Sequence, residues 1–285
     1  MSKWRPRKKG NLYVVPDVHG AHSLLELVLK RITPLRKKDK VVFLGDYIDR
    51  HVDSHKVLDT IIALKKEYGD RVVSLMGNHE LMFLQGLEYV PCDYPGNQLD
   101  MWLNNGGRET IYGYLDRAGL LKSEYFDLHA FMTDPLRLKR VVPKEHVFFL
   151  KSLEPYYEEG KFVFVHGGCH PEQPPSNYDL HTLCWDRSLV KLVTTLINNN
   201  TPPDWSKVIV CGHSTRREPV VHHKYMMLDI GSPRRLLVVE AHTREAFLAK
   251  PNKQRLVRYE LVNTAYVLNC NQEDWPAGPS CEMIG

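Results

Sequence analysis

Runs of β-branched and other apolar residues recur along the chain and predict buried strands. They occupy residues 12–15, 41–44, 72–75, 162–165 and 208–211. These runs contain almost no polar residues, which is typical of strands whose two faces are both covered. The pattern therefore predicts five interior strands.

Apolar residues at helical spacing separate the first three runs. The first stripe comprises Leu25, Val28, Leu29 and Ile32. The second comprises Val57, Leu58, Ile61 and Ile62, and it follows Asp53 and Ser54, residue types that cap helices. Strands and helices thus alternate as β-α-β-α-β, which predicts a layered α/β fold.

The pattern changes to a mostly helical one over residues 84–143. One apolar face consists of Ile111, Tyr114, Leu115 and Ala118, and the turn-rich residues 91–97 interrupt the segment. We interpret it as a helical insertion that covers one edge of the sheet.

Short strands return after Ser214, at residues 226–230, 236–241, 246–249 and 256–261. Turn residues separate them and leave no room for crossover helices, so we expect antiparallel pairing. We divide the chain into an N-terminal arm at residues 1–10, one domain at residues 11–262 and a C-terminal tail at residues 263–285.

Charge is concentrated at the N-terminus. The chain has 285 residues and a formal net charge of +4, and residues 1–10 hold five basic side chains and no acidic one. The rest carries 33 basic and 34 acidic side chains, a net charge of −1. This balance excludes a nucleic-acid-binding domain with a basic surface spread over the fold, and we interpret the arm as a solubilising tail.

Composition favours a soluble, cytoplasmic protein. Charged residues make up 25% and apolar residues 43% of the chain, which excludes disordered and fibrous classes. No run approaches the roughly 18 apolar residues of a membrane span, and no signal peptide is evident. The six cysteines include no CxxC pair, as expected in a reducing compartment.

A cluster of polar residues follows each of the five predicted interior strands. The clusters are Asp17-Val18-His19, Asp46 with Asp49-Arg50, Asn78-His79-Glu80, His166-Gly167-Gly168 and Gly212-His213-Ser214. Ligands of open α/β sheets bind at the carboxyl ends of strands, so these side chains should converge. Carboxylate, amide and imidazole together favour divalent Mn, Fe, Co or Zn, whereas Mg and Ca prefer oxygen alone. The adjoining glycines would let backbone approach an anion such as phosphate.

These segments read PDVHG, GDYIDRH, GNHE, HGG and GHS, and they resemble the motifs of the calcineurin-like metallophosphoesterases. The narrower resemblance is to the phosphoprotein phosphatase (PPP) family, in particular its bacterial and phage serine/threonine phosphatases. It extends to Trp102, to residues 105–110 (NGGRET), to residues 185–187 (WDR) and to residues 228–232 (LDIGS), and covers about residues 11–245.

The resemblance implies a fold, a metal centre and roles for individual residues. The fold would be a sandwich of two mixed sheets flanked by helices around a βαβαβ core. Two divalent ions would be bound, with Mn favoured and Fe, Zn, Co or Ni as alternatives. Asp17 and His19 would hold the first ion, Asn78, His166 and His213 the second, and Asp46 would bridge them. Arg50 and Arg187 would bind phosphate, and His79, hydrogen-bonded to Asp49, would be the catalytic histidine.

Such a centre would hydrolyse phosphate monoesters by attack of a metal-bridging hydroxide, with protonated His79 donating to the leaving oxygen. We expect phosphoserine or phosphothreonine in proteins, or a small phosphoester, as substrate. Dinucleoside polyphosphates and the phosphorylated end of a nucleic acid are alternatives, and a non-catalytic scaffold of the same fold is a remote one. No membrane partner is expected, and the oligomeric state is left open.

Three motif positions depart from the family pattern, namely Pro16, His51 and Ser214. His51 stands where the family has glycine, in a loop whose backbone we expect to need the freedom of a positive φ angle. We interpret it as a loop residue. Five other histidines, His55, His170, His181, His222 and His223, follow no predicted strand and are interpreted as surface or loop residues.

Overall fold

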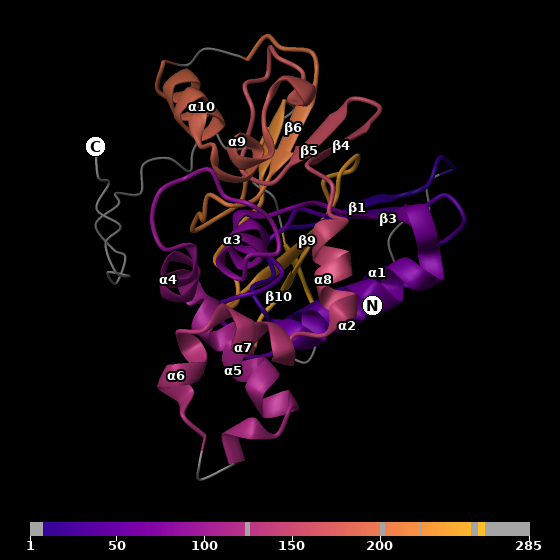
Figure 1. Cartoon of the computed structure of the whole chain (residues 1–285). Coiled ribbons are helices and arrows are strands. Elements are labelled where there is room, and N and C mark those ends of the chain that lie inside the picture. Colours follow the sequence, from indigo (N-terminus) through magenta and orange to yellow (C-terminus); the bar gives the residue numbers. More distant parts are fainter. Residues whose placement is uncertain (1–7, 123–125, 200–202, 223, 252–255, 260–285) are drawn as a thin grey trace.

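The computed structural model describes residues 8–122, 126–199, 203–222, 224–251 and 256–259. Two mixed sheets lie face to face between helices (Figure 1). The first sheet has the strand order β11 (Val257–Tyr259), β10 (Ala246–Ala249), β9 (Leu236–Glu240), β1 (Leu12–Val15), β2 (Lys40–Phe43) and β3 (Val72–Ser74). The second has the order β4 (Tyr156–Glu159), β5 (Phe162–Val165), β6 (Val208–Cys211), β8 (Tyr225–Met227) and β7 (Val220–Val221). The sandwich of two mixed sheets expected from the sequence is confirmed.

The α-helices are α1 (His22–Ile32), α2 (Ser54–Tyr68), α3 (Asn78–Gly86), α4 (Gln98–Trp102), α5 (Arg108–Arg117), α6 (Leu128–Met132), α7 (Pro135–Val141), α8 (Lys144–Lys151), α9 (Leu180–Trp185) and α10 (Ser188–Asn198). Short 3-10 turns lie at Gly69–Arg71, Leu120–Lys122 and Pro175–Asn177. One π-turn, Leu103–Gly107, joins α4 to α5.

The five predicted interior strands are all present, within one residue of the expected ends, and both their faces are covered. In β1, Leu12 and Val14 pack between the two sheets, whereas Tyr13 and Val15 pack against α1 and α2. On the far side of the second sheet, α9 and α10 cover β5 and β6. Strands β1, β2 and β3 run parallel, as do β5 and β6. The carboxyl ends of neighbouring parallel strands, which carry the predicted clusters, therefore lie at the same edge of their sheet.

Helices α1 and α2 bury the two predicted apolar stripes. Asp53 takes the N-cap position of α2, as expected, but its carboxylate accepts no capping hydrogen bond. The backbone of Asp53 has φ −82° and ψ 15° instead of the extended geometry that capping requires, and the carboxylate pairs with Lys56 Nζ at 2.7 Å.

The expectation of antiparallel pairing after Ser214 is only partly right. Strands β9, β10 and β11 pair antiparallel, but β8 pairs parallel with β6. The short edge strand β7 reverses the chain, so β8 returns in the direction of β6. Strands β7 and β4 were not predicted: β7 has two residues, and β4 is a half-exposed edge strand without an apolar run. Residues 260–261 of the last predicted strand lie outside the described residues.

The helices of the insertion lie against other helices, where we had expected them along a sheet edge. Helix α4 packs on α3, and α5 packs on α2. A hydrogen-bonded chain links α5 to α2 through α8, because the buried Tyr114 hydroxyl lies 2.7 Å from His146 Nδ1 and His146 Nε2 lies 2.8 Å from Oδ1 of the exposed Asp59. Of the predicted apolar face, Ala118 is exposed because α5 ends there.

The N-terminal arm is described only from Lys8 onward, and the predicted tail lies outside the described residues. Among the helices that the structure describes, none has the length and apolar character needed to cross a bilayer.

Candidate metal centre

The six predicted metal ligands converge from five strand ends. Asp17 and His19 follow β1, Asp46 follows β2, Asn78 begins α3 after the short segment that follows β3, His166 follows β5, and His213 follows β6. All six side chains are buried, and even the most accessible, His213, is only 7% exposed.

Asp46 lies at the centre of this group. Its Oδ2 atom is 3.5 Å from His19 Nε2, and its Oδ1 atom is 3.2 Å from His166 Nε2. Asn78 Oδ1 is 3.0 Å from both His166 Nε2 and His213 Nδ1. One carboxylate thus faces two sets of nitrogen and oxygen donors, as a bridging ligand does.

The state of the imidazoles fits bound cations. His19 Nδ1 donates to the Ile48 carbonyl at 2.9 Å and His166 Nδ1 donates to the Leu44 carbonyl at 2.8 Å, so in the neutral form of each ring Nε2 is the nitrogen whose lone pair can bind a cation. The Nε2 atoms of His19 and His213 are buried and have no hydrogen-bond partner. Buried polar atoms are seldom left unpaired, so a cation would satisfy these nitrogens.

Asp17 stands differently from its predicted role. Both of its carboxylate oxygens accept from the His213 backbone N–H at 3.1 Å. Among the described residues, the groups whose ligand atoms lie within 4.8 Å of one another are His19, Asp46 and His79, and Asp46, His166 and His213. His79 therefore joins the first group, and the assignment of Asp17 to the first ion stays a prediction.

The ligand loops adopt backbone conformations that non-glycine residues rarely take. The φ angles are positive at His19 (46°), Asp46 (53°), Asp49 (72°), Arg50 (63°) and His213 (58°). His51 is not among the residues with positive φ, so the strain that we expected there falls on Asp49 and Arg50. Such strain costs about 1–3 kcal/mol per residue and persists only where surrounding contacts enforce it.

Two glycines make room for the ligand carboxylates. A Cβ atom on Gly77 would lie 2.2 Å from Asp46 Oδ1, and one on Gly212 would lie 2.1 Å from Asp17 Oδ1. The glycines of the GNHE and GHS segments are therefore required by close packing of backbone against carboxylate.

Burial and charge divide the histidines into two states. Burial lowers the pKa of His19, and it lowers the pKa of His213 to about 3, so both rings are neutral at pH 7, which is the form that binds a metal ion. Burial also acts against the charge of His166, but Asp46 and the further carboxylates around it raise the pKa of His166 to about 9. Cations bound to Asp46 would offset that attraction and favour the neutral ring.

His79 and the two arginines border this group. His79 Nδ1 lies 2.7 Å from Asp49 Oδ2, and His79 Nε2 lies 3.2 Å from Arg50 Nη2 and 3.9 Å from Asp46 Oδ2. Arg50 is exposed beside the buried cluster. Arg187 is exposed in the turn after α9, and its charge contributes to the lowered pKa of His213. Both guanidinium groups stand at the solvent side of the centre.

Glu80, to which the sequence analysis assigned no role, supports the loop that carries Asp46. It is fully buried, and its carboxylate accepts four backbone N–H groups: Asp46 at 2.8 Å, Tyr47 at 2.7 Å, Ile48 at 3.2 Å and Gly77 at 3.1 Å. It therefore fixes the loop that carries the shared ligand. The signal in the sequence is its place three residues after Gly77, where it closes the first turn of α3.

Replacing Glu80 by glutamine should destabilise the protein by about 2–4 kcal/mol. The amide nitrogen of glutamine is a donor, so the backbone N–H groups that now donate to one of the Glu80 oxygens would lose their acceptor. Urea unfolding with a chelator present would measure this, since bound cations add their own stabilisation. Glu26→Gln, on the exposed face of α1, is the matched control. Equal unfolding free energies for the two variants would contradict the role of Glu80.

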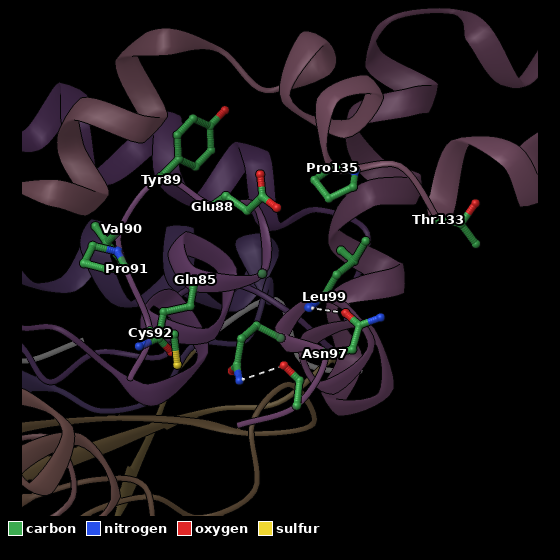
Figure 2. Close-up of a pocket in the computed structure, with 13 residues that line it drawn as sticks. Gln85, Glu88, Tyr89, Val90, Pro91, Cys92, Asn97, Leu99, Thr133 and Pro135 are labelled. Atoms are coloured by element: carbon green, nitrogen blue, oxygen red, sulfur yellow. Dashed lines mark hydrogen bonds between the residues drawn. The ribbon is translucent and has the colours of Figure 1, made fainter. Parts of the chain in front are cut away.

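A cavity of about 590 Å³ lies apart from this centre, in the insertion (Figure 2). Its walls come from the end of α3, the segment 88–92, the beginning of α4 and the turn before α7. None of the predicted ligands, arginines or catalytic residues lines it. The cavity is therefore not where the predicted chemistry would take place.

Two facing mixed sheets with this donor set at their strand ends place the protein among the metal-dependent phosphoesterases. A sequence profile of the calcineurin-like phosphoesterases matches residues 10–228, and the chain belongs to that family. The family resemblance inferred from the motifs is confirmed. Members of the family are hydrolases with a dinuclear divalent metal centre.

Curated relatives include two kinds of enzyme. A symmetrical bis(5'-nucleosyl)-tetraphosphatase from Delftia acidovorans is 30% identical over 112 residues, which cover 39% of this chain and 38% of that protein. A putative serine/threonine-protein phosphatase from Caenorhabditis elegans is 26% identical over 125 residues, 43% of this chain and 33% of that protein. The chain thus matches less than two fifths of the length of each relative.

Solved structures share the fold. A putative diadenosine tetraphosphatase superposes with a TM-score of 0.54 at 20% identity, covering 86% of this chain and 96% of that one. A cold-active protein-tyrosine phosphatase from a psychrophilic Shewanella species gives a TM-score of 0.50 at 17% identity, covering 88% and 80%. At these identities the likeness supports the architecture alone.

Proposed function

We propose that the protein is a phosphoric monoester hydrolase that removes phosphate from phosphoserine or phosphothreonine in proteins and from small aryl phosphates. The observation that carries the proposal is the position of His79, which Asp49 holds between Arg50 and the shared ligand Asp46. A proton donor, an anion-binding group and a bridging carboxylate thus meet at one place.

Two divalent cations held by Asp17, His19, Asp46, Asn78, His166 and His213 would activate a water molecule and stabilise charge on the phosphoryl oxygens. We propose Mn for both, with Fe, Zn, Co or Ni as alternatives that this donor set also accepts. The chain itself supplies the remaining steps.

Arg50 and Arg187 bind the phosphoryl group, because the planar guanidinium fork matches two of its oxygens. Burial acts to lower the pKa of His79, but Asp46 and Asp49 outweigh it and raise the pKa above its ordinary value. Bound cations would cancel part of the contribution of Asp46, so the hydrogen bond and charge of Asp49 would remain the main interactions that raise the pKa of His79. Protonated His79 then donates its Nε2 proton to the leaving oxygen.

A second candidate substrate is a dinucleoside polyphosphate. It is favoured by a row of aromatic rings: Tyr94 stacks on His181 at 4.2 Å, His181 stacks on Trp185 at 5.9 Å, and Trp185 meets the ring of His213 at 6.0 Å. We had expected His181 to be a surface or loop residue, but it is half-buried and lies in helix α9. Flat rings that lead from the centre to the exposed Tyr94 suit a nucleobase.

The two candidates make different predictions for kcat/KM with Mn²⁺ present. We expect the highest value for a phosphoserine or phosphothreonine peptide, compared with a diadenosine polyphosphate and a 3′-phosphorylated oligonucleotide. Trp185→Leu should leave the ratio of peptide to p-nitrophenyl phosphate unchanged. A higher value for the diadenosine polyphosphate, lost in Trp185→Leu, would establish the second candidate. Two bound metals without turnover of any substrate would indicate a scaffold.

For the cell compartment we propose the cytoplasm. Cys92, Cys169, Cys184 and Cys211 are free thiols, and the last three are buried, which suits a reducing environment. The proposed partners are a phosphorylated protein or a small phosphoester, without a membrane, and with nucleic acid only as a phosphorylated end.

A further inference from the structure

Asp49 and Arg50 form a strained pair at the edge of the centre. They are consecutive non-glycine residues, and both have positive φ angles, 72° and 63°. Asp49 holds His79 by a hydrogen bond, and Arg50 lies beside the same ring. The orientation of these two residues therefore decides where the proton donor and the anion-binding group point. Two adjacent residues in this conformation need contacts from elsewhere to keep them there.

The helical insertion supplies those contacts. Trp102 Nε1 donates to both carboxylate oxygens of Asp49, at 3.1 and 3.0 Å. The Thr110 hydroxyl donates to Asp49 Oδ1 at 2.7 Å and accepts the Asp49 backbone N–H at 2.9 Å. The Gly106 carbonyl accepts the Arg50 backbone N–H at 3.0 Å. We call Trp102, Gly106 and Thr110 the insertion clamp.

The π-turn between α4 and α5 makes the clamp possible. In a regular helix, Trp102 and Thr110 would lie about 12 Å apart along the axis and could not reach one carboxylate. The turn breaks the helix at Asn105 and Gly106, which has a φ angle of 104°. A Cβ atom on Gly107 would lie 2.5 Å from the Trp102 ring, and Phe83 meets that ring edge to face at 5.1 Å. The indole is therefore fixed in position.

The clamp leaves Asp49 one orientation. Its Oδ2 atom accepts from His79 and Trp102, and its Oδ1 atom accepts from Thr110 and Trp102. Asp49, Trp102 and Thr110 are all completely buried, so no water competes for the carboxylate. Rotation of the carboxylate would break at least two charged hydrogen bonds together.

We propose that Trp102 and Thr110 are positioning residues for proton donation, which hold Asp49 so that His79 Nε2 points at the leaving oxygen. This inference rests on the proposed phosphatase function, and it gives the helical insertion a role in positioning the proton donor. The step that it affects transfers the Nε2 proton of His79 to the oxygen whose bond to phosphorus breaks.

The test compares two substrates that differ in leaving group, p-nitrophenyl phosphate and phenyl phosphate. Proton donation matters more for the more basic phenolate, so Trp102→Phe and Thr110→Val should lower kcat for phenyl phosphate by about 10- to 100-fold and for p-nitrophenyl phosphate much less. KM and metal content should stay unchanged. Thr110→Ser, which keeps the hydroxyl, should restore kcat, and Trp205→Phe, which removes a buried indole donor to the Lys224 carbonyl, should have no effect.

A readout without turnover separates this inference from the proposed function. In metal-free protein labelled with ¹⁵N-histidine, the Nδ1 proton of His79 should exchange with solvent faster in Thr110→Val and Trp102→Phe than in the wild type. Slow exchange in all variants, equal losses of kcat for both phosphates, or loss of metal would each overturn the positioning role. If the Nδ1 proton of His79 exchanges faster in the variants but the wild type has no phosphatase activity, the role of the insertion clamp is upheld and the phosphatase proposal is refuted.

Discussion

Replacement of His79 by asparagine is expected to lower kcat by about 10²- to 10⁴-fold, the usual contribution of a general acid. Asparagine has no ring nitrogen that can be protonated and then release a proton to the leaving oxygen. The backbone N–H of residue 79, which donates to Asp46 Oδ1 at 3.1 Å, is retained, so the shared ligand should keep its position. Steady-state rates with phenyl phosphate, together with metal analysis, would measure the effect.

The metal content is what distinguishes this result from collapse of the centre. We expect two ions per chain in both the wild type and His79→Asn. His129→Asn, an exposed histidine on α6, is the matched control and should behave as the wild type does. Since His79 also groups with His19 and Asp46, loss of one ion together with activity would show that His79 is a ligand instead of a proton donor.

Asp46→Asn is expected to abolish binding of both cations. Loss of an outer partner of a metal ligand already costs about 10- to 100-fold in affinity, and this change removes a charge that faces both groups of donors. Loss of a single donor to a developing oxyanion costs about 10²–10³ in rate, so loss of both cations should cost more. Metal titration followed by calorimetry would measure the affinity.

Asp116→Asn, an exposed aspartate on α5, is the control for this substitution. Treatment of the wild type with a chelator should reproduce the inactivity of Asp46→Asn, and added Mn²⁺ should restore the wild type alone. Retention of two tightly bound ions in Asp46→Asn would contradict the bridging role.

These predictions share an electrostatic origin. Asp17, Asp46, Asp49 and Glu80 are buried within or beside the centre, and the positive groups that face them are two exposed arginines and the two histidines with raised pKa, His79 and His166. The protein alone therefore does not offer a positive pocket to a phosphate. Divalent cations would reverse that balance, which is why both the affinity for substrate and the rate should depend on them.

Local sequence was sufficient for the interior strands and the helices beside them. The runs at residues 162–165 and 208–211 coincide with β5 and β6, because a strand covered on both faces has to be apolar throughout. Edge strands are not under that constraint, so β4 and β7 left no signal. The direction of β8 depended on β7 and was assigned wrongly for that reason.

By itself the sequence determined the fold class, the family and which side chains would gather at the strand ends, because a buried strand fixes where its following loop emerges. Only the tertiary structure decided what holds those loops. Glu80 binds the backbone of residues 46–48, and Trp102 and Thr110 reach Asp49 from 53 and 61 positions along the chain. Such contacts depend on how α3, α4 and α5 pack and on one break at Gly106, and no local pattern of apolar and polar residues encodes that geometry.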